Sequence, residues 1–366
     1  MFKENKLSKD SKTFTRKVKA IEVKTKKTIS QLLSDMSQTG FQGRNLANLV
    51  EVMEEMLTDG DTTILFGYAG SLSTTGQWKI INWLIENNYI DILVPTGANI
   101  SEDIIDAMGL GYWQGTHLAD NEELFREGFN RYYDVYGDEA DYLKMTELIA
   151  EFILTLDEDH KYSSREFLNL FGKWLGERGI RSIVTLAAEY GVPVFCPAIV
   201  DSPYGDAALI AKSKGFTLSI DAVKDYIEFM SLGGHVKDTG VIYIGGGVPK
   251  DFIQLFAVTS DLLYKDRRIP NRERGFNRKR TGTAETYYPH KYAIQITTDS
   301  PQWGGLSGCT FEEAVSWGKE LPDGGLVQCY CDATIALPIV THALAERVNH
   351  KRKKKNLIKL LNNKRP

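Results

Sequence analysis

The sequence has few of the features that mark metal-binding, secreted or membrane proteins. Its 366 residues include four cysteines, Cys196, Cys309, Cys329 and Cys331. Their spacing is too scattered for a zinc knuckle, and the alternation of a strand puts Cys329 and Cys331 on one face as buried free thiols. No apolar run approaches the roughly 20 residues that cross a bilayer. The lysine-rich N-terminus also lacks the apolar core of a signal peptide. We therefore expect a cytoplasmic protein without a structural metal or a membrane partner.

Composition and charge suggest how the chain is divided. Hydrophobic residues make up 42% of the sequence, which is enough for a sizeable core. The formal charge of -4 conceals basic ends at 3–27 and 351–365. We expect a polar N-terminal arm and first helix over 1–40, a single α/β domain over 41–348 and a basic tail over 349–366. Such a tail either contacts nucleic acid or a membrane surface, or is mobile.

Short apolar runs that end in small or polar residues recur along the chain. They occupy 63–66, 90–94, 192–195, 241–244, 293–296 and 326–330. Helical stretches such as 76–87, 181–189 and 219–230 lie between them. This alternation predicts βαβ units and an α/β fold with a doubly wound, mostly parallel sheet. Ligands of such sheets bind at the carboxyl ends of the strands, which is the predicted place of Gly70, Thr96, Asp201, Gly246, Thr298 and Asp332.

Two glycine-rich stretches, 67–71 and 245–247, follow predicted strands. Glycine lets a backbone approach a phosphate or ribose closely, and a following helix directs its amide groups at the anion. Neither stretch has the usual dinucleotide fingerprint, and many strand-to-helix turns use glycine for geometry alone. By themselves these glycines leave the binding of a dinucleotide open.

A short helix before Lys319 is the most informative feature of the chain. Thr310 and Glu313 form a capping-box signature at its start, and Gly318 is a natural left-handed stop. Lys319 then follows on an irregular segment, where a lysine can act as a nucleophile. Glu313 and Trp317 are four residues apart and share a helical face, a pair suited to a cationic amine. The same residues are also consistent with a helix cap and a core aromatic.

Six stretches of this sequence together resemble the deoxyhypusine synthases. They are FGYAGSLSTTG at 66–76, PTGANISED at 95–103, CPAIVDSPYGD at 196–206, IGGGVPKD at 244–251, SGCTFEEAVSWGKE at 307–320 and CYCDATIALPI at 329–339. The resemblance covers about 41–348. It implies a Rossmann-like, NAD-binding fold that assembles as a homotetramer, with its sites at subunit interfaces.

Carried over residue by residue, the resemblance implies Lys319 as the covalent nucleophile. Glu102 and Asp332 could accept hydrogen bonds from ribose hydroxyls. Asp206 is implied to bind the substrate amine, but its residue type also suits the cap of a helix that begins at Ala207. The implied substrate-binding residues are Glu102, Asp206, Gly246, Asp251, Glu313 and Trp317. The implied NAD contacts are Gly70, Ser71, Leu72, Ser73, Thr74, Thr96, Gly97, Ala98, Glu102, Asp201, Thr298, Asp332 and Ala333.

The chemistry that the resemblance implies is the transfer of a 4-aminobutyl group from spermidine. Hydride removal to NAD makes an imine, diaminopropane leaves, and the remainder passes to Lys319 as a Schiff base. An acceptor amine then takes it, and the same NADH reduces the product. Lys319 must be neutral when it attacks, and a bound polyamine beside an indole favours the neutral form. We interpret Glu313 as a group that holds the amine rather than one that activates Lys319.

Three positions depart from the family pattern. Asp251 stands where the family has a histidine after its glycine turn, and Leu306 stands where an amine-binding carboxylate is expected. Ser101 replaces another usual acid. These changes indicate a changed substrate or acceptor. The acceptor is a protein lysine giving deoxyhypusine, putrescine giving homospermidine, or agmatine, and the sequence does not choose among them.

A basic segment interrupts the resemblance at about 265–286. Its charge density favours an acidic protein or RNA, although a solvated loop packed against a neighbouring subunit has the same composition. It supports an alternative function, a nucleic-acid- or ribosome-binding protein on a non-catalytic scaffold. A third possibility is an amine dehydrogenase or lyase that performs only the first half-reaction. The basic residues are Lys265, Arg267, Arg268, Arg272, Arg274, Arg278, Lys279 and Arg280.

Overall fold

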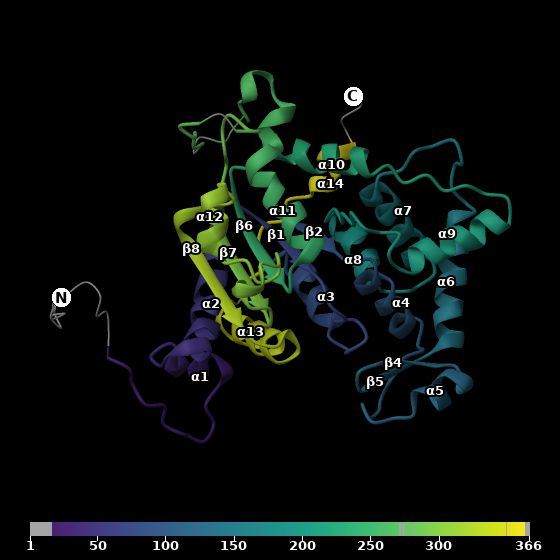
Figure 1. Ribbon diagram of the computed structural model, residues 1–366, viewed down its shortest axis with the longest axis horizontal. Coiled ribbons are helices and arrows are strands. Elements are labelled where there is room, and N and C mark those ends of the chain that lie inside the picture. The colour runs from purple at the N-terminus through teal and green to yellow at the C-terminus, as the bar shows by residue number, and fades with distance from the viewer. Residues whose placement is uncertain (1–16, 271, 273–274, 281, 349, 363–366) are drawn as a thin grey trace.

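A five-stranded parallel sheet forms the centre of the molecule (Figure 1). The computed structural model describes residues 17–270, 272, 275–280, 282–348 and 350–362. The strand order across the sheet is β2-β1-β6-β7-β8. The strands are β1 (Thr62–Tyr68), β2 (Ile92–Pro95), β6 (Asp238–Ile244), β7 (His290–Thr297) and β8 (Glu320–Tyr330).

A sixth segment extends this sheet beyond β2. Val194 forms a parallel bridge with Leu93, and the Phe195 amide donates to the Leu93 carbonyl at 2.9 Å. Counted in chain order, the six segments lie in the order 3-2-1-4-5-6, which is the order of a Rossmann sheet. The prediction of a doubly wound parallel sheet is therefore confirmed, and all six predicted strand segments take part. The run at 192–195 joins the sheet only through the isolated bridge between Val194 and Leu93.

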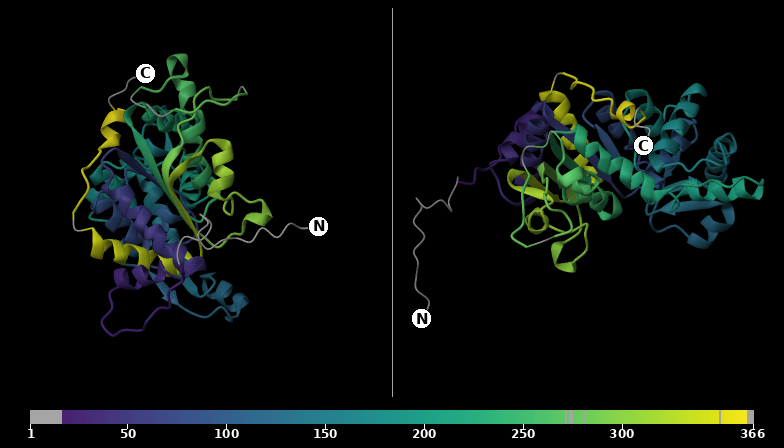
Figure 2. Two further views of the ribbon diagram at one scale, coloured as in Figure 1. Left: turned by 90° about the vertical axis from the view of Figure 1, so that its left-hand side faces the viewer. Right: turned by 90° about the horizontal axis from the view of Figure 1, so that it is seen from above.

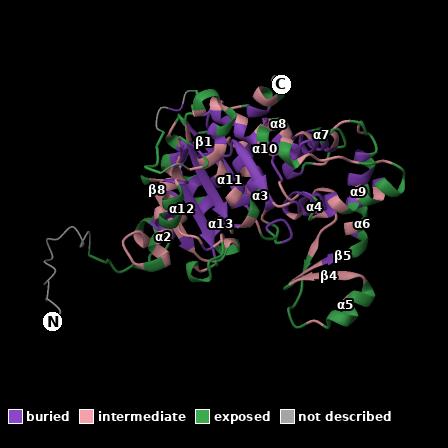
Figure 3. Cartoon of the chain, turned by 45° about the horizontal axis from the view of Figure 1, so that its top comes forward, coloured by how far each residue is buried: buried purple, intermediate pink, exposed green. Residues whose placement is uncertain are grey.

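Alternate residues of each strand face two separate hydrophobic layers, because successive side chains of a strand point to opposite faces. Phe66 of β1 packs in the larger core with α2 (Phe41–Thr58) and α13 (Ala333–Arg347). Its neighbour Leu65 packs in the second core with α10 (Ala222–Ser231) and α11 (Gly247–Thr259). Strands buried on both faces read as the continuous apolar runs seen in the sequence. Figure 3 shows them as a buried block.

The helical predictions at 76–87, 181–189 and 219–230 correspond to α3, α8 and α10. The remaining helices cover the sheet or extend it to one side (Figures 1 and 2). Their bounds are α1 (Ile29–Met36), α3 (Trp78–Glu86), α4 (Glu102–Ala107), α5 (Asn121–Glu127), α6 (Glu139–Ile153), α7 (Ser164–Glu177), α8 (Ile183–Tyr190), α9 (Pro203–Ser213), α12 (Phe311–Trp317) and α14 (Leu357–Asn362).

An antiparallel extension stands apart from the parallel sheet and was not predicted. It contains β3 (Tyr112–Gln114), β4 (Phe129–Tyr132) and β5 (Val135–Asp138) in the order β3-β5-β4, together with α5. Its residues are mostly exposed or half-buried, in contrast to the central strands (Figure 3). These short strands lack the continuous apolar run by which the equally short but buried β2 was recognised in the sequence.

Part of the described C-terminal tail is packed against the body, so the expectation of a mobile tail is wrong for 350–362, while its contact with nucleic acid or a membrane surface stays a prediction. Arg352 is buried and pairs with buried Asp91 at 3.1 Å. Leu357 and Ile358 of α14 are also buried. Burial of their apolar side chains and the ion pair offset the cost of ordering this segment. The tail residues 363–366 and the arm residues 1–16 lie outside the described residues.

The basic segment is only partly a solvated loop. Arg272 is buried, donates to the Tyr288 carbonyl at 3.1 Å and lies 5.1 Å from the Tyr288 ring centroid. Burial lowers the pKa of its guanidinium to about 10. Lys265, Arg268 and Lys279 are exposed, and Arg274 lies outside the described residues. Within the described ranges, no helix is both long and apolar enough to span a membrane.

Candidate functional site

The turn that presents Lys319 has the predicted local structure. The Thr310 hydroxyl accepts from the Glu313 amide at 3.1 Å, and α12 ends at Gly318 with φ 80°. A Cβ at Gly318 would lie 2.8 Å from the Tyr287 ring, so both the left-handed backbone and the close approach require glycine. Lys319 follows as a bend directly before β8.

The Lys319 side chain is nearly enclosed but reaches a pocket. Its Nζ donates to Asp251 Oδ1 at 3.0 Å and to Gln254 Oε1 at 3.2 Å. It also lies 5.4 Å from the Trp317 ring centroid. Asp251 and Gln254 both come from α11, so the helix that begins at the glycine turn brings a carboxylate and an amide to Lys319.

A buried acid lies behind this lysine. Gln254 Nε2 donates to Glu320 Oε1 at 2.9 Å, while Glu320 Oε2 is buried without a hydrogen-bond partner among the described residues. Burial raises the pKa of Glu320 to about 7, and a hydrogen bond from Gln254 limits the rise. Sequence reasoning missed both residues. The predicted strand began at 326, so no local signal in the sequence indicated a buried acid at Glu320.

The pocket beside Lys319 has a volume of about 660 Å³ and collects four of the predicted residues. Glu313 and Trp317 line it from the exposed face of α12, as their spacing predicts, and Asp251 and Lys319 line it from the other side. Leu306, one of the three departures, also faces it. The basic segment adds three residues that were not predicted to lie there, namely Arg278, Gly282 and Thr283, and Tyr287 directly after the segment also lines the pocket.

A fully buried lysine fixes the loop that carries Leu306. Lys250 Nζ donates to Gln295 Oε1 at 3.0 Å, the Leu306 carbonyl at 3.1 Å and the Cys309 carbonyl at 2.9 Å. Burial lowers the pKa of Lys250. The same loop packs on Gly246, where a Cβ would lie 2.4 Å from the Ser307 backbone. Gly246 is thus covered by the chain itself, and its glycine serves this close approach.

A second group of predicted residues lies at the carboxyl ends of β1 and β2, where Asn99 joins two loops. The Ser73 hydroxyl donates to the Asn99 carbonyl at 2.6 Å, and the Leu72 amide donates to Asn99 Oδ1 at 3.1 Å. Asn99 Nδ2 donates to Thr96 Oγ1 at 2.8 Å and also to the Gly70 carbonyl. The structure therefore brings 70–74 and 96–98 together. Asn99 itself was not predicted.

A pocket of about 680 Å³ opens beside these loops. Ser73 and Thr74 line it together with Gln77, and Gln77 Nε2 donates to the Thr334 carbonyl at 2.7 Å. This bond places the start of α13, with Asp332 and Ala333, near the loop after β1. Asp332 caps α13, because its Oδ1 accepts from the Thr334 amide at 2.7 Å. Asp201 and Thr298 are exposed after their strand segments.

These carboxyl-end loops have features that fit a dinucleotide. Gly70 is exposed with φ 88°, and a Cβ there would meet nothing within 4 Å, so its backbone is open to a ligand. Gln77 Oε1 is buried without a hydrogen-bond partner among the described residues. The loops lie at the carboxyl ends of a sheet with the Rossmann order, where such ligands bind.

Glu102 and Asp206 lie away from Lys319. Glu102 is buried, accepts from the Tyr132 hydroxyl at 3.2 Å, and has its pKa raised by burial to about 7. Asp206 is exposed in the first turn of α9, which begins at Pro203, so it is not the cap of a helix starting at Ala207. The pocket that Lys319 lines contains neither acid.

The topology explains this separation. Glu102 follows β2, which lies next to the bridging segment at one side of the sheet, whereas Lys319 precedes β8 at the opposite edge. Three strands lie between β2 and β8, and neighbouring strands are spaced by about 4.8 Å. The two acids therefore belong to the carboxyl-end half of the candidate site, and Lys319 belongs to the other half.

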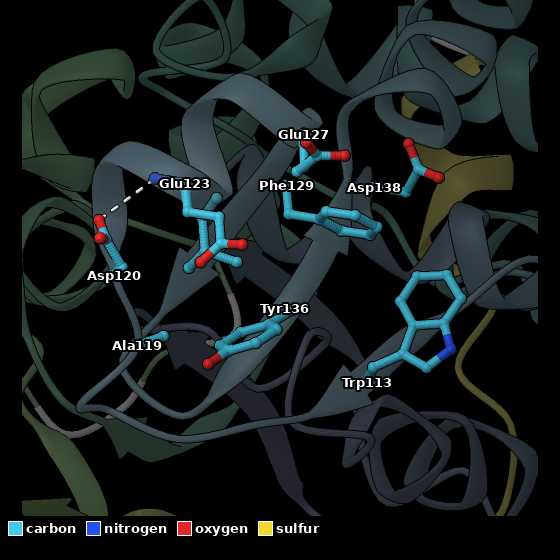
Figure 4. A pocket seen from close by; sticks show the side chains of 9 residues that line it. Trp113, Ala119, Asp120, Glu123, Glu127, Phe129, Tyr136 and Asp138 are labelled. Atoms are coloured by element: carbon cyan, nitrogen blue, oxygen red, sulfur yellow. Dashed lines mark hydrogen bonds between the residues drawn. The ribbon is translucent and has the colours of Figure 1, made fainter.

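A further pocket of about 640 Å³ lies on the antiparallel extension (Figure 4). Trp113, Phe129 and Tyr136 form its apolar walls. Carboxylates also line it, including Asp120, which accepts from the Glu123 amide at 3.2 Å. None of the predicted site residues lines this pocket.

Cys329 and Cys331 lie on one side of the end of β8, as their spacing predicts, with their Sγ atoms 3.2 Å apart. Cys329 is buried and Cys331 is half-buried, and both are free thiols. Cys196 is buried as well, whereas Cys309 is half-buried and lines the Lys319 pocket.

Comparison with known proteins gives a consistent result. The model of the deoxyhypusine synthase family matches residues 31–344. The chain is 44% identical over 329 residues to "Probable deoxyhypusine synthase 2" of Methanosarcina mazei, with 89% of each chain covered. It is 44% identical over 309 residues to the protein of that name in Archaeoglobus fulgidus, covering 84% of this chain and 95% of the other. It is 35% identical to "Deoxyhypusine synthase-like protein" of Chlorobaculum parvum, with 86% of each chain covered.

Among solved structures, the fold is similar to that of a candidate deoxyhypusine synthase from Entamoeba histolytica. The TM-score is 0.58 at 19% identity, and the match covers 92% of this chain and 99% of the other. At this identity the similarity concerns the fold alone.

Proposed function

Because the chain belongs to the deoxyhypusine synthase family, we propose that it is an NAD-dependent transferase that moves a 4-aminobutyl group from spermidine to an acceptor amine. The observation that carries this proposal is the position of Lys319, which lies in a pocket with an exposed carboxylate, Glu313, and an exposed indole, Trp317. These are the groups needed to hold a cationic amine beside a nucleophilic one.

Lys319 forms the covalent link in this reaction. Its Nζ attacks the imine carbon of the oxidised donor, a new carbon–nitrogen bond forms, and the bond to diaminopropane breaks. The attacking amine must lose a proton, and Asp251 Oδ1, 3.0 Å from Nζ, is placed to accept it. Asp251 thus takes the position at which the family has an imidazole, with a carboxylate in its place.

Glu313 and Trp317 hold the amine that is not reacting. Both are exposed on one face of α12, so a ligand can reach them without displacing core side chains. A carboxylate and a π-face within one helical turn attract the same ammonium group. Leu306 lies on the loop that Lys250 fixes, and its side chain supplies apolar surface for the methylene chain of the bound amine.

NAD would be held by the carboxyl-end loops, and it supplies a hydride acceptor that later returns the hydride to the product. Gly70 offers open backbone, and the joined segments 70–74 and 96–98 give a preformed surface. Exposed Asp201 and Asp332 are placed to accept from ribose hydroxyls. Glu102 is buried after β2 and accepts a hydrogen bond from the Tyr132 hydroxyl at 3.2 Å, so we assign it to this half of the site by its place in the chain alone.

The separation of the two halves supports a site built by two copies of the chain. The Lys319 pocket and the acids Glu102 and Asp206 lie at opposite sides of one sheet. A second subunit would bring its Lys319 pocket to the carboxyl-end loops of the first. We therefore propose that the protein acts as an oligomer, with the homotetramer as the expected state.

The test is the release of diaminopropane from spermidine and NAD, measured by mass spectrometry. We expect release by the native protein, loss of more than about a thousandfold in Lys319→Ala, and no change in Lys279→Ala, an exposed lysine outside the pocket. Mass spectrometry of the second product names the acceptor among a protein lysine, putrescine and agmatine. Accumulating NADH without an adduct would identify an amine dehydrogenase. No release together with no NAD binding would favour a nucleic-acid-binding protein instead.

A further inference from the structure

The basic segment contributes part of the wall of the Lys319 pocket. Gly282 and Thr283 line it, and Arg278 lines it as a cation. This segment interrupts the family resemblance. Its Arg278 therefore adds to the pocket a positive charge that none of the family-motif residues provides. Glu313 and Trp317 hold an ammonium group on one side of the pocket, whereas an added cation in this wall opposes a further ammonium there and attracts an anionic group.

Two contacts fix the Arg278 guanidinium at the end of α12. One of its nitrogens donates to the Ser316 carbonyl at 3.1 Å, and its guanidinium carbon lies 4.8 Å from the Tyr287 ring centroid. A guanidinium has five N–H donors, so this arrangement leaves others available to a ligand. No carboxylate in the described part of the chain lies within ion-pair distance of Arg278.

The remaining charges of the pocket divide into one pair and two single groups. Asp251 and Lys319 neutralise each other at 3.0 Å. Glu313, exposed in the first turn of α12, and Arg278, bound to its last turn, are left without an ion-pair partner among the described residues. The pocket thus offers a carboxylate carried by the first turn of α12 and a guanidinium bound to its last turn.

We propose that the acceptor is a small amine that also carries a carboxylate. This rests on the proposed transfer from Lys319 and specifies its substrate class. The acceptor carboxylate binds Arg278 through charge-assisted hydrogen bonds, and this contact orients the amine toward Lys319. The acceptor nitrogen bonds to the imine carbon, the bond from that carbon to Nζ breaks, and the released Nζ retains a proton from the acceptor amine. Hydride return from NADH completes the product.

The experiment compares two acceptors of matched length, putrescine and 5-aminopentanoate, in which a carboxylate replaces one ammonium. With spermidine and NAD present, we expect kcat/KM for 5-aminopentanoate to exceed that for putrescine by about ten- to hundredfold, the range of a charged hydrogen bond. Arg278→Gln should abolish this preference, and Lys279→Gln, its exposed neighbour outside the pocket, should retain it.

Diaminopropane release separates the two proposals. Release with putrescine as the preferred acceptor would overturn the carboxylate assignment while leaving the transfer chemistry intact. An unchanged preference in Arg278→Gln would overturn the role of Arg278. If no variant releases diaminopropane, the transfer fails, and calorimetric binding of 5-aminopentanoate still tests the pocket. Binding to the native protein that weakens at least tenfold in Arg278→Gln supports the carboxylate contact, and equal binding overturns it.

Discussion

Lys319 Nζ lies 3.0 Å from Asp251 Oδ1, so the lysine at the centre of the candidate site has a carboxylate as its nearest charged neighbour. This pair comes from α11 and from the turn before β8, which are 68 residues apart in the chain. A carboxylate at this distance stabilises an ammonium, while the proposed attack requires a neutral amine. Asp251 therefore has to act as both counter-ion and proton acceptor.

Asp251→Asn should make Lys319 more reactive toward a carbonyl, because the ion pair no longer favours the charged form of the lysine. Imine formation with a small aldehyde, trapped by borohydride and detected by mass spectrometry, measures this reactivity without NAD. At one fixed pH we expect the trapping rate to rise by roughly severalfold, since Asp251 is partly exposed and its field is screened. Glu312→Gln is the control. A trapping rate that stays constant or falls in Asp251→Asn would contradict the ion pair as the governing contact.

Glu313→Gln should weaken the binding of spermidine without changing Lys319. Loss of one charged contact is worth about 1.5 to 3 kcal/mol, or roughly ten- to hundredfold in Kd by calorimetry. The rate of borohydride trapping at Lys319 should stay constant, because the carboxylate that contacts Nζ is Asp251. Glu312→Gln is a matched control, as Glu312 is exposed in the same turn but does not line the pocket. An altered trapping rate with an unchanged Kd would make Glu313 an activator instead.

Glu320 should destabilise the protein as pH rises. Its pKa is about 7 in the folded chain and about 4.5 when unfolded. Between these values the folded state binds the additional proton, so the free energy of unfolding falls as pH increases from about 4.5 to 7. Glu320→Gln removes this penalty. We expect the substitution to raise the free energy of unfolding by about 2 kcal/mol more at pH 8 than at pH 5. Urea denaturation at both pH values measures the difference, and an equal effect at both would show that Glu320 does not titrate in this range.

Arg352→Ala should lower the free energy of unfolding by about 3 kcal/mol, since it leaves the buried Asp91 carboxylate without its cation. Lys354→Ala removes an exposed neighbour in the same basic run and should change stability by less than about 0.5 kcal/mol. Urea denaturation measures both variants. If Arg352→Ala and Lys354→Ala lowered the free energy of unfolding equally, the loss of a positive charge would explain the change, and the buried ion pair would not.

The sequence predicted the elements whose signals are local. Strands buried on both faces appear as continuous apolar runs, so the sheet could be read directly from the chain. The helix before Lys319 was equally clear, because Thr310 and Gly318 mark its ends through their own side-chain and backbone chemistry. The common face of Glu313 and Trp317 follows from helical spacing.

Contacts between distant segments escaped this reasoning. Asn99 joins two loops through both its side chain and its carbonyl, and Lys250 is buried against carbonyls of a loop more than 50 residues away. Nothing in the residues next to either one specifies these partners. The packed tail was also missed, because a run of lysines and arginines gives no sign that Arg352 has a buried partner.

The sequence by itself determined the order of strands and helices, the lysine turn and the family, since each depends on residue types at short spacing. Only the tertiary structure decided which charges meet. It placed Asp251 against Lys319, put Arg278 in the wall of the same pocket, and left Glu102 at the opposite side of the sheet. The physical reason is that electrostatic and hydrogen-bonding partners act over a few ångströms of space, whatever their separation along the chain.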